Sequence, residues 1–170
     1  MKTFVNAFDY AGHICKMLPG GILMTTKAGG TVDTMTIGWG TIGIQWGKPI
    51  FIAFVRDSRY TKEQLDRCGE FTVNVPLQGA DKRILGYCGS KSGRDTDKIT
   101  DLGLTLEAPE VISVPGIREL PLTLECRVLY RQFQQEDTLP ADLYRRYYPG
   151  PAEDYHTAFY GEIVSAYIIE

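Results

Sequence analysis

The sequence predicts a mainly β fold, a β-barrel decorated with short helices. Strand-like runs dominate the chain from residue 22 to residue 169, and the helix candidates between them are short. The two kinds of element do not alternate regularly, so the pattern does not favour repeated βαβ units around a parallel sheet. Because no internal repeat, linker or low-complexity segment interrupts the chain, we expect a single domain over residues 1–170.

The first strands are predicted from a turn and from an apolar run. Residues 22–26 and an extended run beginning at Val32 flank a glycine-containing turn, which predicts a hairpin. Residues 50–55 are continuously apolar and follow Pro49, which predicts a strand buried on both faces.

Three further strands are expected in the second half of the barrel. Residues 71–75 alternate in type and end at a proline. Residues 122–128 alternate cleanly between apolar and polar, which predicts one buried and one solvated face. Residues 158–169 are also strand-like, and Gly161 among them indicates a bulge or a close approach of the backbone.

Short helices are expected between these strands, at 61–68, 80–88, 96–102 and 140–147. Thr61 and Gln64 have the spacing of a capping box, and Gly69 is a plausible helix stop. Gly103 follows the third helix, and Pro140 suits the first turn of the fourth.

Composition bounds the function. The chain has 170 residues, a net charge of −3 and a pI of about 5.5, so no overall basic field favours nucleic acid or an anionic membrane. Residues 1–17 do not resemble a signal peptide, and no apolar run is long enough to cross a bilayer. The four cysteines form no CxxC pair, so we expect free thiols, no metal site and a cytoplasmic location.

The most informative segment is 55–62, where the apolar run ends at Arg56 and Arg59, hydroxyl residues and a helix start. Backbone N–H groups at a helix N-terminus and guanidinium groups both favour a bound anion, phosphate above all. The alternative is a solvated polar loop after a core strand.

Residues 34–47 contain four glycines and two tryptophans, an unusual composition for a core strand. Glycine allows close approach to the backbone, so a large flat ligand would lie along it with Trp39 or Met35 over one face. The alternative is a barrel corner with packed tryptophans.

Two other features have a functional and a structural interpretation. Residues 89–98 are rich in glycine, hydroxyls and cations, and either add donors to a phosphate site or form a polar connection whose Asp95 or Thr96 caps a helix. Of the two histidines, we expect His13 to be structural or exposed, whereas His156 lies either in a pocket or at the surface.

Taken together, the sequence resembles the flavin reductase-like family with an FMN-binding split barrel, and within it the flavoredoxin-like branch. The resemblance spans residues 17–169 and rests on segments in the family's order: 33–40, a strand led by Pro49, 58–61, 69–76, 92–99 with Gly103 after it, and His156 before 161–164. One departure is Asp33, which stands where relatives often carry Asn. A carboxylate pointing at the flavin would lower its potential, whereas one pointing outward would be a turn residue.

The resemblance implies a homodimer of six-stranded split barrels with FMN near the dimer interface. It places along the isoalloxazine edge Met35, Thr36, Ile37 and Gly38, with Trp39 close by. It places around the phosphate Arg56, Ser58, Arg59, Tyr60 and Thr61, with Ser92 and Lys98 adding donors. His156 would lie on the nicotinamide or substrate side of the ring. The tyrosines of 132–157 would stack on a flat ligand or simply pack.

The function implied is an FMN-dependent oxidoreductase, an NAD(P)H-dependent flavin or flavoprotein reductase in which NADH or NADPH gives a hydride to N5 of FMN. An FMN electron carrier served by a redox protein partner, without direct use of nicotinamide, is the first alternative. A non-enzymatic split barrel that binds a small ligand or haem, and a pyridoxamine-phosphate-oxidase-like activity, remain further alternatives.

Overall fold

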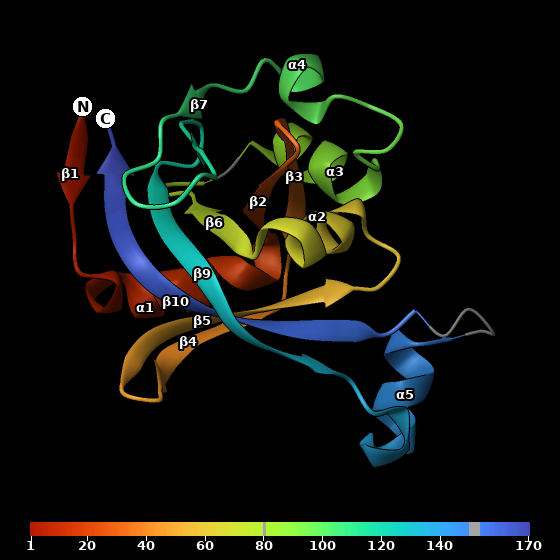
Figure 1. Ribbon diagram of the computed structural model, residues 1–170. Helices are drawn as coiled ribbons and strands as arrows, with labels where there is room; N and C mark the ends of the chain where they lie inside the picture. The colour runs from red at the N-terminus through yellow and green to blue at the C-terminus, as the bar shows by residue number, and fades with distance from the viewer. Residues whose placement is uncertain (80, 150–153) are drawn as a thin grey trace.

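The computed structural model describes residues 1–79, 81–149 and 154–170, and its architecture is mainly β (Figure 1). The main sheet of the described chain has eight strands, all paired antiparallel: β1 (Lys2–Phe4), β2 (Ile22–Ala28), β3 (Thr31–Ile37), β4 (Gly40–Gln45), β5 (Lys48–Arg56), β6 (Glu70–Val75), β9 (Leu122–Phe133) and β10 (His156–Ile169). Two short strands, β7 (Leu106–Glu107) and β8 (Gly116–Ile117), form a separate pair.

The sheet curls into a barrel that is not closed. Its strand order is β3-β2-β6-β9-β10-β5-β4, and β3 and β4 are the two end strands of this order. Strand β1 pairs with the C-terminal end of β10. The predicted split-barrel class is therefore confirmed, in a sheet that carries more strands than the six the resemblance implied. Only Gly38 and Trp39 connect β3 to β4, so the opening of the barrel coincides with the glycine-rich segment of the sequence.

The long strands β9 and β10 connect the two halves of the barrel, and Figure 1 shows both as continuous arcs. Their pairing shifts register at Tyr160/Gly161 and again at Ile163/Ser165. A Cβ added at Gly161 would lie 2.6 Å from Cζ of Phe71. Gly161 therefore marks both a bulge and a close approach, as predicted.

Strand β5 alternates between the core and a less buried face. Phe51, Ala53 and Val55 are completely buried, whereas Ile52 and Phe54 are only partly buried. The prediction of burial on both faces is wrong for the latter two residues, and Phe54 borders the cavities described below.

Strand β9 departs from its sequence pattern in the opposite sense. All residues from Leu122 to Cys126 are buried, so the predicted solvated face is wrong for Thr123 and Glu125, whereas Arg127 on the same face is exposed as predicted. The polar residues on that face have partners inside the protein. Thr123 accepts a hydrogen bond from the Asn74 side chain at 2.9 Å, and the Glu125 carboxylate accepts backbone N–H groups from residues 110, 111 and 112 at 2.7, 2.8 and 3.2 Å.

The helices are short and lie around the barrel: η1 (Ala7–Tyr10), α1 (Ala11–Met17), η2 (Leu18–Gly20), α2 (Tyr60–Cys68), α3 (Lys82–Ser90), α4 (Lys98–Leu102), η3 (Glu136–Thr138) and α5 (Ala141–Tyr147). The four predicted helices are confirmed within about two residues at each end. The three helical segments before β2, which are η1, α1 and η2, were not predicted. Over the described residues, no helix has both the length and the apolar character that a membrane crossing requires.

Helices α2 and α4 end at glycine as expected, but the residues that cap their N-termini differ from the prediction. Gly69 and Gly103 adopt left-handed conformations and end α2 and α4. The predicted capping box of α2 is wrong: Arg59 occupies the N-cap, and Gln64 instead accepts from the Thr26 hydroxyl at 2.5 Å. Asp97, rather than Asp95 or Thr96, caps α4 through its side chain.

Candidate functional site

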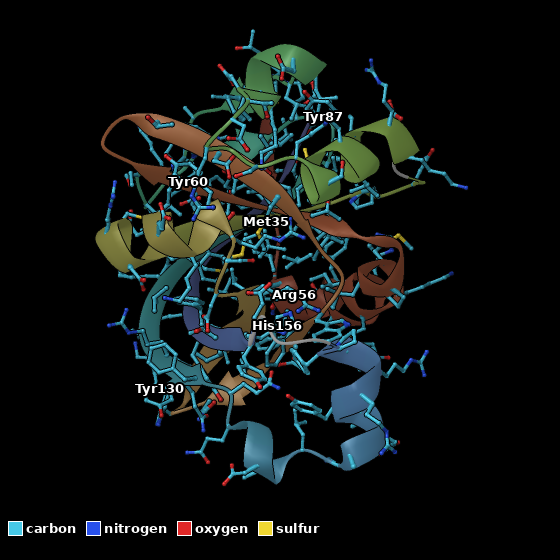
Figure 2. All side chains as sticks on the ribbon, turned by 90° about the vertical axis from the view of Figure 1, so that its right-hand side faces the viewer. Met35, Arg56, Tyr60, Tyr87, Tyr130 and His156 are labelled. Atoms are coloured by element: carbon cyan, nitrogen blue, oxygen red, sulfur yellow. The ribbon has the colours of Figure 1, made fainter. Side chains whose placement is uncertain are left out.

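Three adjoining cavities follow the opening of the barrel. The anion cavity, of about 200 Å³, lies between the start of α2 and residues 90–98. The middle cavity, of about 180 Å³, is bordered by residues 35–39 and the end of β5. The aromatic cavity, of about 530 Å³, lies between Trp39 and α5. Figure 2 shows Met35, Arg56 and His156 following one another from the centre of the barrel toward α5.

Positive charge concentrates in the anion cavity although the chain as a whole is acidic. Its lining contains two carboxylates, Asp33 and Asp154, against five cations: Arg56, Arg59, Lys91, Arg94 and Lys98. The hydroxyl groups of the lining come from Ser58, Tyr60, Thr61, Ser90 and Ser92. Cations, hydroxyls and the start of α2 together form a site suited to a phosphate group.

Most of these cations already contact protein acceptors. Arg59 donates through Nη1 to the carbonyl of Gly89 at 3.0 Å, which connects the start of α2 to the end of α3. Arg94 donates through Nε to Glu63 at 3.1 Å and through Nη1 to the carbonyl of Ser58 at 3.0 Å. The guanidinium groups are therefore positioned by the fold rather than extended into solvent.

The carboxylate of Asp154 accepts hydrogen bonds from both the backbone and the side chain of Ser58. Its Oδ1 accepts the backbone N–H of Ser58 at 2.9 Å, and its Oδ2 accepts the Ser58 hydroxyl at 2.8 Å. Arg56 donates to the Asp154 carbonyl at 2.9 Å. An anion therefore already occupies part of the donor set at the start of α2.

Asp33 and Lys98 form a buried ion pair at the back of the anion cavity. Their side chains are 4% and 2% exposed, and Nζ of Lys98 lies 3.0 Å from Oδ1 of Asp33. Burial raises the pKa of Asp33, although the neighbouring Lys98 charge opposes the shift. The second oxygen, Oδ2, is buried without a hydrogen-bond partner among the described residues. Asp33 is thus neither an exposed turn residue nor an isolated charge.

The middle cavity is bordered by the backbone of residues 35–38, whose side chains pack or hydrogen-bond with other parts of the protein. Met35 and Ile37 are buried in the core, and the Thr36 hydroxyl donates to the carbonyl of Leu85 at 2.7 Å. A Cβ at Gly38 would meet only an ordinary contact, 3.5 Å from the Leu18 carbonyl. The arrangement of 35–38 is that of an extended edge beside a cavity, the setting in which main-chain groups meet a flat ligand.

The aromatic cavity differs from its neighbours because none of the described residues that line it is charged. Its thirteen lining residues are Cys15, Leu18, Pro19, Gly38, Trp39, Gly40, Phe54, Gln134, Leu139, Leu143, Tyr147, Tyr148 and His156. Trp39 forms part of its wall, with its ring centroid 5.1 Å from that of Tyr147 and 4.6 Å from that of His156. Such a lining suits an apolar or aromatic ligand.

His156 lies where the cavities meet. It is the first residue of β10, opposite Arg56 of β5 in the ladder, and it lines both the middle and the aromatic cavity. Burial, and then the charge of Arg56, lower the pKa of His156 to about 4. Its ring is therefore neutral at physiological pH, with Nδ1 2.7 Å from the Tyr148 hydroxyl.

The structure brings all the sequence-predicted site residues to these three cavities. Met35, Thr36, Ile37, Gly38 and Trp39 line the middle cavity, with Arg56, Arg59 and His156 beside them. Ser58, Tyr60, Thr61, Ser92 and Lys98 line the anion cavity. Their contacts with a ligand remain predictions. His13 lies outside the cavities, with Nε2 2.7 Å from the carbonyl of Pro76, and is structural as expected.

Sequence reasoning missed several lining residues. Phe54 was assigned to the core, although the alternation along β5 was a signal that every second side chain leaves it. Nothing in the local sequence marks Asp154 or Gln134, which reach the cavities from the segment after β9. The tyrosines of the 132–157 segment pack on one another, with Tyr148 and Tyr155 rings 5.3 Å apart, while Tyr147 lies against Trp39.

Comparison with curated proteins finds relatives without an assigned function. An uncharacterized protein of Archaeoglobus fulgidus is 33% identical over 97 residues, which are 57% of this chain and 54% of that protein. The uncharacterized protein YddH of Escherichia coli is 28% identical over 135 residues, 79% of this chain and 61% of that protein. The chain spans little more than half the length of these relatives.

Comparison with solved structures and with protein families is more informative. Flavoredoxin from Methanosarcina acetivorans is 29% identical, with a TM-score of 0.66 over 88% of this chain and 68% of that one. Flavoredoxin of Desulfovibrio vulgaris (23%, TM-score 0.66, 88% and 69% of the two chains) shares the fold. So does nitrilotriacetate monooxygenase component B from Bacillus cereus (17%, TM-score 0.67, 98% and 78%). Residues 17–170 match the flavin reductase like domain, so the chain belongs to the flavin reductase-like family.

Proposed function

We propose that this protein is an FMN-dependent oxidoreductase. The observation that carries the proposal is the continuity of the anion cavity with the middle cavity, which share Met35, Arg56 and Arg59. A cation-rich space that leads into a space bordered by extended backbone matches a ligand with a phosphate at one end and a flat ring at the other. Solved structures of similar fold include proteins described as FMN-binding.

The residues assigned to the cofactor follow from this arrangement. Arg59, Arg56 and the donors of Ser58 hold the phosphate, and the backbone of 35–38 meets the polar edge of the ring system. The unpartnered Oδ2 of Asp33 supplies a buried acceptor for a hydroxyl of the ribityl chain. The pairing of Lys98 with Asp33 leaves Arg59 as the main discriminator of the phosphate. When bound, FMN supplies hydride or single-electron transfer, chemistry that no side chain provides.

We further propose NADH or NADPH as the electron donor, with His156 on the donor side of the ring. One observation favours the second candidate, an FMN electron carrier reduced by a redox protein. In the part of the chain that the structure describes, the aromatic cavity, where a donor would approach, is lined by no charged residue that would hold the pyrophosphate of a dinucleotide.

Two experiments, a fluorescence titration and an anaerobic absorbance measurement, test the cofactor and the electron donor separately. Flavin fluorescence should show FMN binding more tightly than riboflavin, since only FMN carries the phosphate. Equal affinities would contradict the assignment of the anion cavity. An anaerobic spectrum of the FMN-loaded protein is then recorded before and after NADH, and again after NADPH. Rapid bleaching supports the reductase and identifies its donor, whereas a flavin that stays oxidised supports the carrier.

We also propose that the protein forms a homodimer. An exposed aromatic group lies outside the cavities, where Trp46, Tyr130 and Tyr160 have ring centroids 5.2 to 6.0 Å apart. Ile44 and Phe133 nearby along the chain are 65% and 58% exposed. Exposed apolar groups of this size commonly mark an interface. Light scattering should give about twice 19.0 kDa, and a monomer that retains FMN would contradict the proposal.

A further inference from the structure

A hydrogen-bond chain at the border of the aromatic cavity has not been used above. It runs from Gln134, in the segment after β9, through Tyr148, after α5, to His156 at the start of β10. The Tyr148 hydroxyl donates to Oε1 of Gln134 at 2.7 Å, and its oxygen lies 2.7 Å from Nδ1 of His156. Three distant segments therefore converge on one imidazole ring.

With the amide oxygen of Gln134 facing Tyr148, the hydrogen-bond chain determines where the imidazole carries its proton. A tyrosine hydroxyl has a single proton, and that of Tyr148 is donated to the Gln134 amide oxygen. The short contact with His156 then requires Nδ1 to be the donor and the hydroxyl oxygen to be the acceptor. In a neutral imidazole with its proton on Nδ1, Nε2 carries a lone pair and accepts a hydrogen bond.

We propose that Tyr148 and Gln134 are positioning residues that fix His156 as the Nδ1–H tautomer, and that the aromatic cavity binds a neutral aromatic compound whose hydroxyl donates to Nε2. Three features of the cavity support this ligand class. Its volume of about 530 Å³ accepts one or two fused rings, its lining over residues 1–79, 81–149 and 154–170 has no charged residue, and its walls include Trp39, Phe54 and Tyr147.

The low pKa of His156 agrees with this assignment, because a ring that stays neutral keeps its acceptor nitrogen over the whole physiological range. A carboxylate ligand would instead meet a lone pair and, among the described lining residues, no cation. The ligand site does not depend on the flavin, because Nε2 of His156 and the apolar walls belong to the protein itself. Failure of FMN binding would therefore leave this inference standing, and the reverse also holds.

The tautomer is tested directly by NMR on protein labelled with ¹⁵N in histidine. The chain contains only two histidines, and His13 is an internal reference. Its Nε2 faces the carbonyl of Pro76 at 2.7 Å, and a carbonyl can only accept, so His13 carries its proton on Nε2. We expect the two rings to show opposite ¹⁵N patterns at pH 7. A His156 with its proton on Nε2, or one that is charged, would overturn the inference.

Two phenylalanine variants separate positioning from packing. Tyr148→Phe removes the acceptor of Nδ1–H and should convert His156 to a mixture of tautomers. Tyr144→Phe removes a hydroxyl from the same tyrosine group, one that lies 3.2 Å from the Tyr155 hydroxyl, and should leave the His156 pattern unchanged. An unchanged pattern in Tyr148→Phe would show that Tyr148 does not determine the tautomer.

The ligand class is tested by titrating the protein with three naphthalenes of similar size. Binding is monitored through the ¹⁵N shift of His156, with and without FMN. We expect 2-naphthol to bind about fivefold tighter than 2-methoxynaphthalene, because the ether lacks the donated proton. The anion 2-naphthoate should bind weakest. The preference for naphthol should disappear in Tyr148→Phe and persist in Tyr144→Phe. Equal binding of naphthol and its ether, preferred binding of the naphthoate, or no binding of naphthol would each overturn the proposal.

Discussion

The anion cavity and the aromatic cavity hold their side chains in different ways. In the anion cavity, Asp154, Arg59 and Lys98 already have protein partners, so a ligand must exchange one partner for another. In the aromatic cavity the rings of Trp39 and Tyr147 pack edge to face around unfilled space, so a ligand only has to fill it. Specificity at the first end therefore depends on competing charges, and at the second on shape and a single hydrogen bond.

The largest expected effect is the loss of Lys98. Lys98→Met leaves the Asp33 carboxylate buried without its cation, which should lower the free energy of unfolding by about 3–5 kcal/mol. Urea unfolding measures this loss, and it should be greater at pH 8 than at pH 5, because a protonated Asp33 is neutral. Adding Asp33→Asn to the variant should restore much of the stability. A variant within about 1 kcal/mol of the parent protein would contradict the role of this pair.

The next effect sharpens the contrast in charge between the two cavities. Arg59→Ala should weaken FMN binding about 10- to 100-fold, the usual range for a charge-assisted hydrogen bond, and change riboflavin binding little. Arg83→Ala is the matched control, since the exposed Arg83 lies on α3 and lines none of the three cavities. Parallel losses for both flavins in Arg59→Ala would mean that its guanidinium positions the loop and does not meet the phosphate.

A smaller effect is expected from filling the space beside the buried pair. A Cβ at Gly93 would overlap the Asp33 carboxylate and lie 2.7 Å from Cδ1 of Tyr60. Gly93→Ala should therefore cost about 1–3 kcal/mol of stability and reduce FMN binding. Gly86→Ala on α3 is the control, because nothing lies within 4 Å of its added Cβ, and it should be neutral or slightly stabilising. Similar stability of the two variants would show that the loop at Gly93 adapts without cost.

An effect that is absent at neutral pH concerns acid stability at the aromatic end. His156 has a pKa of about 4 when folded and an ordinary value of 6.5 when unfolded, so unfolding takes up a proton between these pH values. Stability from the neutral ring is present above pH 6.5 and is lost as the pH falls toward 4. As the pH falls through this window, the unfolding free energy of the parent protein should therefore decline more steeply than that of His156→Phe. The difference in slope corresponds to the uptake of at most one proton on unfolding. Identical slopes would contradict the low pKa.

The sequence located most of the long strands and helices well, because these depend on local patterns, whereas the ligand contacts of the candidate site residues remain predictions. The hairpin around the turn before Val32, the helix stop at Gly69 and the close approach at Gly161 each follow from one residue type and its neighbours. The apolar run that ends at Arg56 correctly located the anion cavity, since the end of a core strand must lie at the edge of the barrel.

Two of the incorrect predictions, those for Gln64 and Glu125, share one cause, a polar side chain whose partner is distant in sequence. Gln64 has the spacing of a capping residue but accepts from Thr26, 38 positions away. Glu125 fits a solvated face but binds backbone groups of the segment before it, and is completely buried. The Asp33–Lys98 pair spans the chain in the same way. Local spacing carries no information about such partners, so only the fold reveals them.

The ring contact between Trp39 and His156 also gives the molecule an optical reporter. The chain has only two tryptophans, and the other, Trp46, lies on the exposed turn between β4 and β5. Trp46→Phe would leave a single indole, placed where the middle and aromatic cavities adjoin. Its emission would be quenched by energy transfer when a flavin occupies the middle cavity and shifted in wavelength when a ligand displaces water from the aromatic one. One fluorophore would thus distinguish occupation of either cavity.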